Sequence, residues 1–207
     1  MKKVPIMLDL SGKKVLVVGG GKAAQIKIEN FVDCGCEIQV VAPKITENIE
    51  FFVNQGKVSW RRKQFSFSDF EGVSLVVAAA DEWVNQIVFQ QAKLAGILCS
   101  TVQGTGDFIF PSAKQVEDLT IAVSTNGKYP LLAKKIVEQA DYSAAKQLDT
   151  LDRIRKAARK SIKNHRLRNE FLNEVLVRNI ETFEEGKRLL EVYREKESLY
   201  ENKKAEI

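Results

Sequence analysis

Three consecutive glycines at residues 19–21 constrain this chain more than any other feature. They follow a short apolar run, residues 15–18, which predicts a buried β-strand, and they precede a helical pattern. Gly19, Gly21 and Ala24 match the G-x-G-x-x-G/A turn that opens a dinucleotide-binding unit. The first glycine permits a tight turn and the second lets the backbone approach a diphosphate. Glycine-rich turns also serve as plain connections, so the motif alone does not distinguish a dinucleotide-binding turn from a simple connection.

The neighbouring sequence favours a coenzyme site. Apolar residues at near-helical spacing predict a helix as far as Cys34, and residues 38–41 predict a second strand that ends before Pro43. The three elements form a βαβ unit. We therefore expect NAD as the cofactor, with its diphosphate against Gly19, Gly21, Lys22 and Ala23.

The end of the second predicted strand lacks an acidic residue. Many NAD sites place Asp or Glu there to bind the ribose hydroxyls, but here the position falls in Val41, Ala42 and Pro43. We expect backbone groups and apolar contacts at Ala42 and Pro43 to hold the adenosine. The sequence leaves the choice between NAD and NADP open.

Strands and helices alternate from residue 13 to residue 113. Further strands are predicted at residues 58–62, 75–79, 97–102 and 108–110, with helices at residues 47–55 and 83–94. Such alternation predicts a Rossmann-like α/β fold, a mostly parallel sheet with helices on both faces. Ligands of these sheets bind beyond the carboxyl ends of the strands, so residues 19–23, 78–81 and 102–107 should converge on one crevice. Small residues end the fourth strand, and we expect Ala79 and Ala80 to line the coenzyme site, although plain packing also explains them.

The chain changes character in its second half. Residues 119–123 predict a strand, a turn-rich loop follows, and a helix begins near Leu131, beyond which nearly everything is helical. We predict a nucleotide-binding domain at residues 1–113, a small αβ dimerisation segment at 114–145 and a C-terminal helical domain at 146–207. Ser124 begins the loop.

Composition narrows the function classes. No apolar run approaches the roughly 20 residues that span a bilayer, and the three cysteines fit a reducing compartment, so we expect a cytoplasmic protein without a membrane partner. The net charge is +5, but the basic residues alternate with apolar ones at helical spacing, which indicates a solvated helix face rather than nucleic-acid binding. His165 is the single histidine, and no metal site is expected.

Several segments together resemble the NAD-dependent precorrin-2 dehydrogenases, which also occur as the dehydrogenase module of siroheme synthase. The resemblance covers about residues 4–140, and its most specific part is the serine-containing loop followed by P-x-L-A. The matching pieces are PIMLDL at 5–10, VLVVGGGKAA at 15–24, VVAP at 40–43, residues 75–81 with Asn85, FIFPS at 108–112 and LTIAVSTNGKYPLLAKKI at 119–136.

The resemblance implies dehydrogenation of precorrin-2 to sirohydrochlorin in siroheme biosynthesis by a homodimer. The implied substrate is a tetrapyrrole with many carboxylates, so the resemblance also implies a positively charged rim that includes Lys22 and Lys128, with Lys134, Lys135 and Arg153 as further members. Ser124 then either hydrogen-bonds a substrate carboxylate or serves only as a turn residue. It also implies a carboxylate base. Where many family members carry Asp, this chain has Gln103, and Asp107 is the candidate catalytic residue in its place. A bifunctional dehydrogenase and ferrochelatase, or a non-catalytic NAD-binding sensor or assembly protein, are the alternatives.

Overall fold

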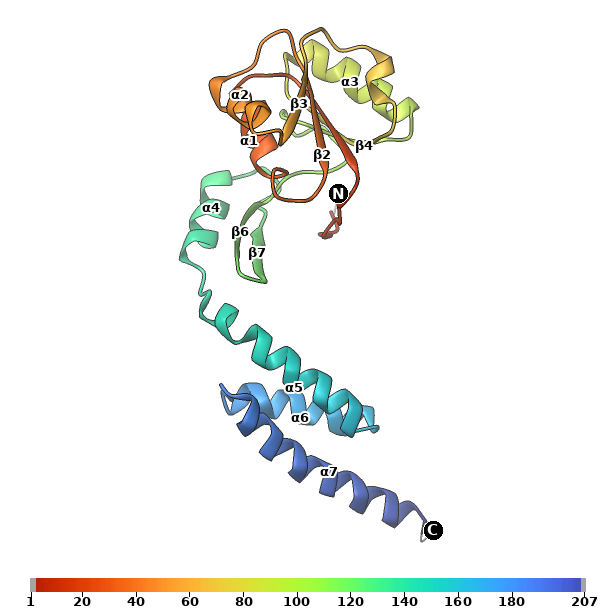
Figure 1. The fold of residues 1–207 in the computed structure, drawn as a ribbon, viewed down its shortest axis with the longest axis vertical. Coiled ribbons are helices and arrows are strands. Elements are labelled where there is room, and N and C mark those ends of the chain that lie inside the picture. Colours follow the sequence, from red (N-terminus) through yellow and green to blue (C-terminus); the bar gives the residue numbers. More distant parts are fainter. Residues whose placement is uncertain (1–2, 206–207) are drawn as a thin grey trace. The chain divides into compact units, whose positions relative to one another are not determined.

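The computed structural model describes residues 3–205 and contains two compact units, of which the first ends at Phe110 and the second begins at Pro111. The first unit is built on one five-stranded sheet in the order β3-β2-β1-β4-β5 (Figure 1). Every strand pair in it is parallel, which confirms the predicted sheet type. The strands are β1 (Lys14–Val18), β2 (Glu37–Val41), β3 (Val58–Arg61), β4 (Val73–Ala78) and β5 (Leu98–Thr101).

Helices cover both faces of this sheet, as predicted. Val15 and Val17 of β1 belong to one core together with residues of α1 (Lys22–Glu29) and α2 (Glu47–Asn54). Leu16 and Val18 point to the other face, whose core includes residues of α3 (Glu82–Leu94) and of the 3-10 helix η1 (Phe67–Phe70). A central strand buried on both faces reads as a continuous apolar run. The apolar run at residues 15–18 therefore predicted β1 correctly.

Two predictions for the first unit are wrong, namely the end of the first helix and the strand at residues 108–110. The first helix ends at Glu29 and not at Cys34, because the side-chain amide of Asn30 donates to the carbonyl of Ile26 at 2.8 Å and so competes with the helical backbone bond. Residues 108–110 form no strand. Phe110 instead packs edge-to-face on Phe31, with ring centroids 5.6 Å apart, at the border of the α1 core.

The second unit begins with an antiparallel hairpin of β6 (Ser112–Val116) and β7 (Leu119–Val123). β7 was predicted from the sequence, whereas β6, whose residues are mostly polar and exposed, was not. The turn that joins the strands is Glu117 and Asp118, with Glu117 at φ 50°, and this pair lacks the Asn-Gly type of signal that marks two-residue hairpins. Helix α4 (Pro130–Gln139) turns Ala133 and Val137 inward.

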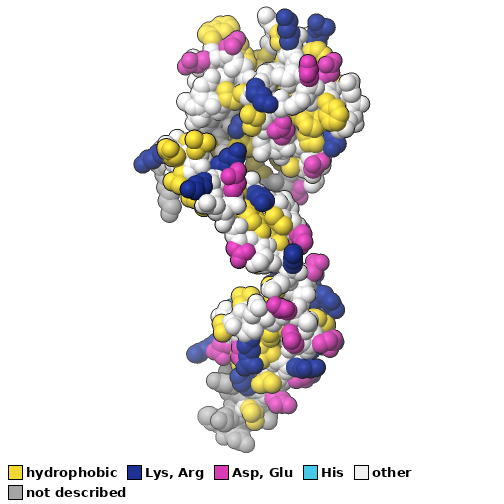
Figure 2. Space-filling view, turned by 90° about the vertical axis from the view of Figure 1, so that its left-hand side faces the viewer, with side chains coloured by type: hydrophobic (Ala, Val, Ile, Leu, Met, Phe, Trp, Pro, Cys, Tyr) yellow, Lys and Arg dark blue, Asp and Glu magenta, His cyan; other side chains and the backbone are white. Residues whose placement is uncertain are grey.

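Three helices complete the second unit after the short 3-10 helix η2 (Ser143–Gln147). Helices α5 (Leu148–Ser161), α6 (His165–Val177) and α7 (Phe183–Ala205) share one apolar core. Gly186 lets α7 approach α5 closely, since a Cβ there would lie 2.5 Å from Cδ1 of Ile154. On the face in Figure 2, basic and acidic side chains alternate over this helical part. Within residues 3–205, no helix is both long and apolar enough to cross a membrane.

Candidate functional site

The glycine turn after β1 is packed on two sides by backbone. Gly19 has φ +123°, and a Cβ on it would lie 2.2 Å from the carbonyl oxygen of Ala79. A Cβ on Gly20 would lie 2.0 Å from the carbonyl oxygen of Lys44. Real Cβ atoms do not approach other atoms so closely, so neither position accepts a side chain without a backbone shift. The tight turn was predicted at Gly19, and the structure shows that Gly20 is constrained as well.

Gly21 differs from its two neighbours because the space beside it is open. No atom lies within 4 Å of a Cβ built there, and Gly21 is the N-cap of α1 with no side chain capping the helix. The first turn of α1 contains no acidic residue and begins with the exposed Lys22 and Ala23. First-turn N–H groups have no acceptor inside the helix, and the helix dipole favours an anion. These residues therefore fit the diphosphate of a nicotinamide dinucleotide.

The segment after β2 is tied to the glycine turn and to β3. The backbone N–H of Thr46 donates to the carbonyl of Gly20 at 2.9 Å. Ala42 is buried, and its carbonyl accepts a 2.9 Å hydrogen bond from the indole Nε1 of Trp60, while Pro43 is exposed. Sequence reasoning missed both partners, although a threonine just before an apolar helix is a recognisable N-cap signal.

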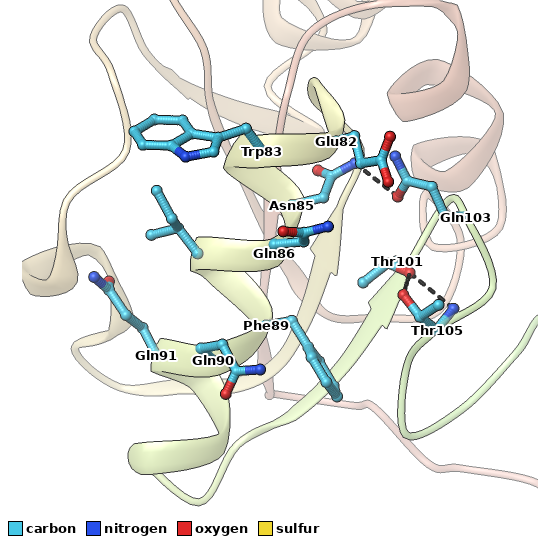
Figure 3. Close-up of a pocket in the computed structure, with 11 residues that line it drawn as sticks. Glu82, Trp83, Asn85, Gln86, Phe89, Gln90, Gln91, Thr101, Gln103 and Thr105 are labelled. Carbon is cyan, nitrogen blue, oxygen red and sulfur yellow. Dashed lines mark hydrogen bonds between the residues drawn. The ribbon is translucent and has the colours of Figure 1, made fainter.

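The segment after β4 is joined to the loop after β5 by one buried side chain, Asn85. Its Oδ1 accepts from the backbone N–H of Ala80 at 2.8 Å, and its Nδ2 donates to the carbonyl of Ala80 at 2.8 Å. Nδ2 also donates to Oε1 of Gln103 at 3.0 Å (Figure 3). Ala79 is buried, and its backbone N–H donates to the carbonyl of Val18. The predicted residues Gly19, Ala79 and Ala80 thus lie together, as expected, and their contacts with the coenzyme stay predictions.

A cavity of about 490 Å³ opens beside this junction, between α3 and the loop after β5. Such a volume is within the range of small-molecule sites. Figure 3 shows the hydroxyls of Thr101 and Thr105 directed toward each other, at 2.9 Å, on the loop side. The lining residues are Glu82, Trp83, Asn85, Gln86, Ile87, Phe89, Gln90, Gln91, Thr101, Gln103 and Thr105. They include no residue of the glycine turn.

Asp107 does not lie with Gln103 at the carboxyl end of β5. Its backbone N–H donates to the carbonyl of Cys99 at 2.8 Å, and its Oδ2 accepts from the backbone N–H of Cys99 at 2.9 Å. The chain therefore doubles back along β5 after Thr105. Burial and the neighbouring charge of Asp107 raise the pKa of the Cys99 thiol to about 12. Gln103 reaches the segment after β4 through Asn85, as expected, whereas Asp107 lies beside β5, and its catalytic role stays a prediction.

The predicted substrate residues Ser124 and Lys128 lie in the second unit, on the loop after β7. Both are exposed. The hydroxyl of Ser124 accepts a 3.1 Å hydrogen bond from the backbone N–H of Asn126, which is the geometry of a turn serine. Their contacts with substrate stay predictions. Among the residues that the structure describes, no group of three or more His, Cys, Asp or Glu side chains is placed to hold a metal ion, and His165 is exposed.

A parallel sheet in the order 3-2-1-4-5 with a glycine turn at the first strand–helix junction defines a dinucleotide-binding α/β protein. Residues 6–112 match the model of a protein family described as "Putative NAD(P)-binding". The chain belongs to this family, and the match confirms the expected class of cofactor.

The chain is also similar to siroheme synthases and to a solved precorrin-2 dehydrogenase structure. The chain is 33% identical over 166 residues to a siroheme synthase of Photorhabdus laumondii, which covers 79% of this chain and 35% of the relative. It is 35% identical over 144 residues to siroheme synthase 1 of Serratia proteamaculans, covering 68% of this chain and 30% of the relative. The chain thus spans about a third of the length of these relatives. A solved structure of SirC, a precorrin-2 dehydrogenase, matches with a TM-score of 0.68 and 26% identity over 93% of this chain and 100% of that chain.

Proposed function

We propose that this protein is an NAD-dependent dehydrogenase that oxidises precorrin-2 to sirohydrochlorin in siroheme biosynthesis. The observation that carries the proposal is the likeness to the precorrin-2 dehydrogenase SirC. It extends over 93% of the chain and so includes the second unit as well as the nucleotide-binding one. A nucleotide-binding unit alone would support only a coenzyme, because such sheets serve many chemistries.

The bound coenzyme supplies the hydride acceptor in this reaction. The chain's own residues bind and orient the reactants. The first turn of α1, with Lys22, holds the diphosphate, and the Ala79 and Ala80 segment leaves room for a flat ring. Ser124 and Lys128 bind substrate carboxylates by hydrogen bonding and charge.

An anaerobic turnover assay tests the proposal. Purified protein with precorrin-2 and NAD should form NADH together with the absorption spectrum of sirohydrochlorin. Calorimetric binding of NAD without turnover would contradict the proposed enzymatic activity and favour a coenzyme sensor or assembly protein. Consumption of added ferrous ion with formation of siroheme would show the bifunctional enzyme.

We further propose that the protein is a homodimer and that α4 contributes to the interface. With Ala133 and Val137 turned inward, three apolar side chains of α4 remain exposed: Leu131, Leu132 and Ile136. Exposed apolar groups of this kind mark association surfaces. Light scattering at micromolar concentration should give a dimer mass, Ile136→Glu should give a monomer, and Lys135→Glu on the same helix should leave the dimer intact. A monomeric parent protein would refute this part.

The proposed location is the cytoplasm. Cys34, Cys36 and Cys99 are all free, which fits a reducing compartment. Fractionation of the native cells should recover the protein with soluble cytoplasmic markers. Recovery with membrane or periplasmic markers would contradict the proposal.

A further inference from the structure

Oxidation of the macrocycle releases one hydrogen as hydride and another as a proton, so the chain has to provide a group that accepts this proton. In a doubly wound sheet the reaction takes place beyond the carboxyl ends of the strands. Three carboxylates lie in the segments that follow β4 and β5: Asp81, Glu82 and Asp107. Their surroundings differ enough to separate them.

Two of the three are poorly placed. One oxygen of Asp107 is held by the backbone N–H of Cys99, alongside β5 rather than beyond its end. Asp81 is the N-cap residue of α3 and does not line the cavity. Glu82 lines the cavity, together with Asn85 and Gln103. Within residues 3–205 its carboxylate forms no hydrogen bond or ion pair, so both of its oxygens are available.

The buried Asn85 fixes the orientation of the side chain opposite Glu82. Because Nδ2 of Asn85 donates to Oε1 of Gln103, the amide group of Gln103 keeps its two N–H donors for other partners. In Figure 3 the side chains of Glu82 and Gln103 end in the same region of the cavity, beside Asn85. A carboxamide does not accept a proton at neutral pH, whereas a carboxylate does. The cavity therefore has a hydrogen-bond donor and a proton acceptor at one end.

Resting on the proposed function, we infer that the carboxylate of Glu82 is the group that removes the proton from the substrate. The bond between that hydrogen and the macrocycle breaks, and the proton bonds to a carboxylate oxygen of Glu82. The electron pair of the broken bond enters the double-bond system of the macrocycle, and the hydride goes to the nicotinamide. The proton then passes from Glu82 to water. Trp83, which is 72% exposed, and Phe89 offer apolar surface in the same cavity for the macrocycle.

The test compares Glu82→Gln, Asp107→Asn and Glu50→Gln in the full-length protein. Glu50 is a matched control, since it is an exposed glutamate in the first turn of α2 as Glu82 is in the first turn of α3. Loss of a general base lowers turnover by about 100-fold or more. We expect this loss in kcat for Glu82→Gln, with unchanged calorimetric affinity for NAD and a near-normal KM. Glu50→Gln should behave as the parent protein.

Two further readouts separate a base from a structural residue. The acidic limb of the kcat–pH profile should disappear in Glu82→Gln. The double variant Glu82→Gln/Gln103→Glu exchanges the amide and the carboxylate between these two positions. Its kcat should be at least about tenfold higher than that of Glu82→Gln alone. A Glu82→Gln protein that keeps more than half of the parent kcat, or a loss confined to Asp107→Asn, overturns the inference and leaves the proposed function standing. A parent protein that binds NAD but does not oxidise precorrin-2 overturns both.

Discussion

Alanine at two neighbouring glycines should separate folding from coenzyme binding. Neither Gly20 nor Gly21 has a positive φ, so the substitutions differ only in what the new methyl group meets. At Gly20 it would lie 2.0 Å from the carbonyl oxygen of Lys44, which forces the segment after β2 to move by about 1 Å or more. Overpacking of this kind costs about 1–3 kcal/mol. The movement also strains the hydrogen bond from Thr46 to Gly20, which contributes about 1 kcal/mol.

We therefore expect Gly20→Ala to lower the free energy of unfolding of the first unit by about 2–4 kcal/mol. Gly21→Ala should lower it by less than about 1 kcal/mol, because its methyl group enters open space and only the N-cap preference is lost. The same methyl group takes up room for the diphosphate, so NAD affinity should fall by about tenfold or more, or about 1.4 kcal/mol.

Urea denaturation followed by tryptophan fluorescence measures the first effect. The chain has two tryptophans, Trp60 and Trp83, both in the first unit, so the signal reports that unit alone. Calorimetric titration with NAD measures the second effect. An unchanged urea midpoint for Gly20→Ala, or parent-like NAD affinity for Gly21→Ala, would refute the geometric reasoning.

Three other perturbations test the packing. Burial raises the pKa of Asp69, but hydrogen bonds from Lys63 and from the Ser66 backbone outweigh it and hold that pKa below the ordinary 3.8. A carboxyl group whose pKa is lower in the folded than in the unfolded protein stabilises the fold at pH values above its unfolded pKa. This contribution should be lost as the pH falls below about 4. In urea denaturation, Asp69→Asn should therefore make the free energy of unfolding less dependent on pH in this acidic range. Asn85→Ala should lower the unfolding free energy by about 2–3 kcal/mol, because the backbone N–H of Ala80 loses its acceptor, and should weaken NAD binding measured by calorimetry. Unchanged stability would contradict a structural role of the Asn85 hydrogen bonds. Tyr193→Phe should lower the free energy of unfolding by about 1.5–3 kcal/mol, because it removes the hydrogen bond to the Glu174 carboxylate and keeps the ring contact with Phe171. A loss well above about 3 kcal/mol in thermal unfolding would show that the ring packing had also changed.

The first unit was largely predictable because its signals are local. A strand covered on both faces needs apolar residues throughout, and a tight turn beside other backbone needs glycine, so β1 and Gly19 are visible in the sequence alone. The hairpin strand β6 was not visible. Its residues are mostly exposed, and it exists as a strand because it pairs with β7.

The same contrast holds for the site. The sequence by itself determined the parallel α/β sheet, the dinucleotide turn and the class of coenzyme, because each depends on residues close together in the chain. Only the tertiary structure decided which carboxylates face the cavity. Hydrogen bonds with the backbone of Cys99 hold Asp107 beside β5, while Glu82, the first residue of α3, lines the cavity. The hydrogen bonds of Asp107 and Gln103 join the loop after β5 to β5 and to α3, so their geometry exists only after these elements have packed.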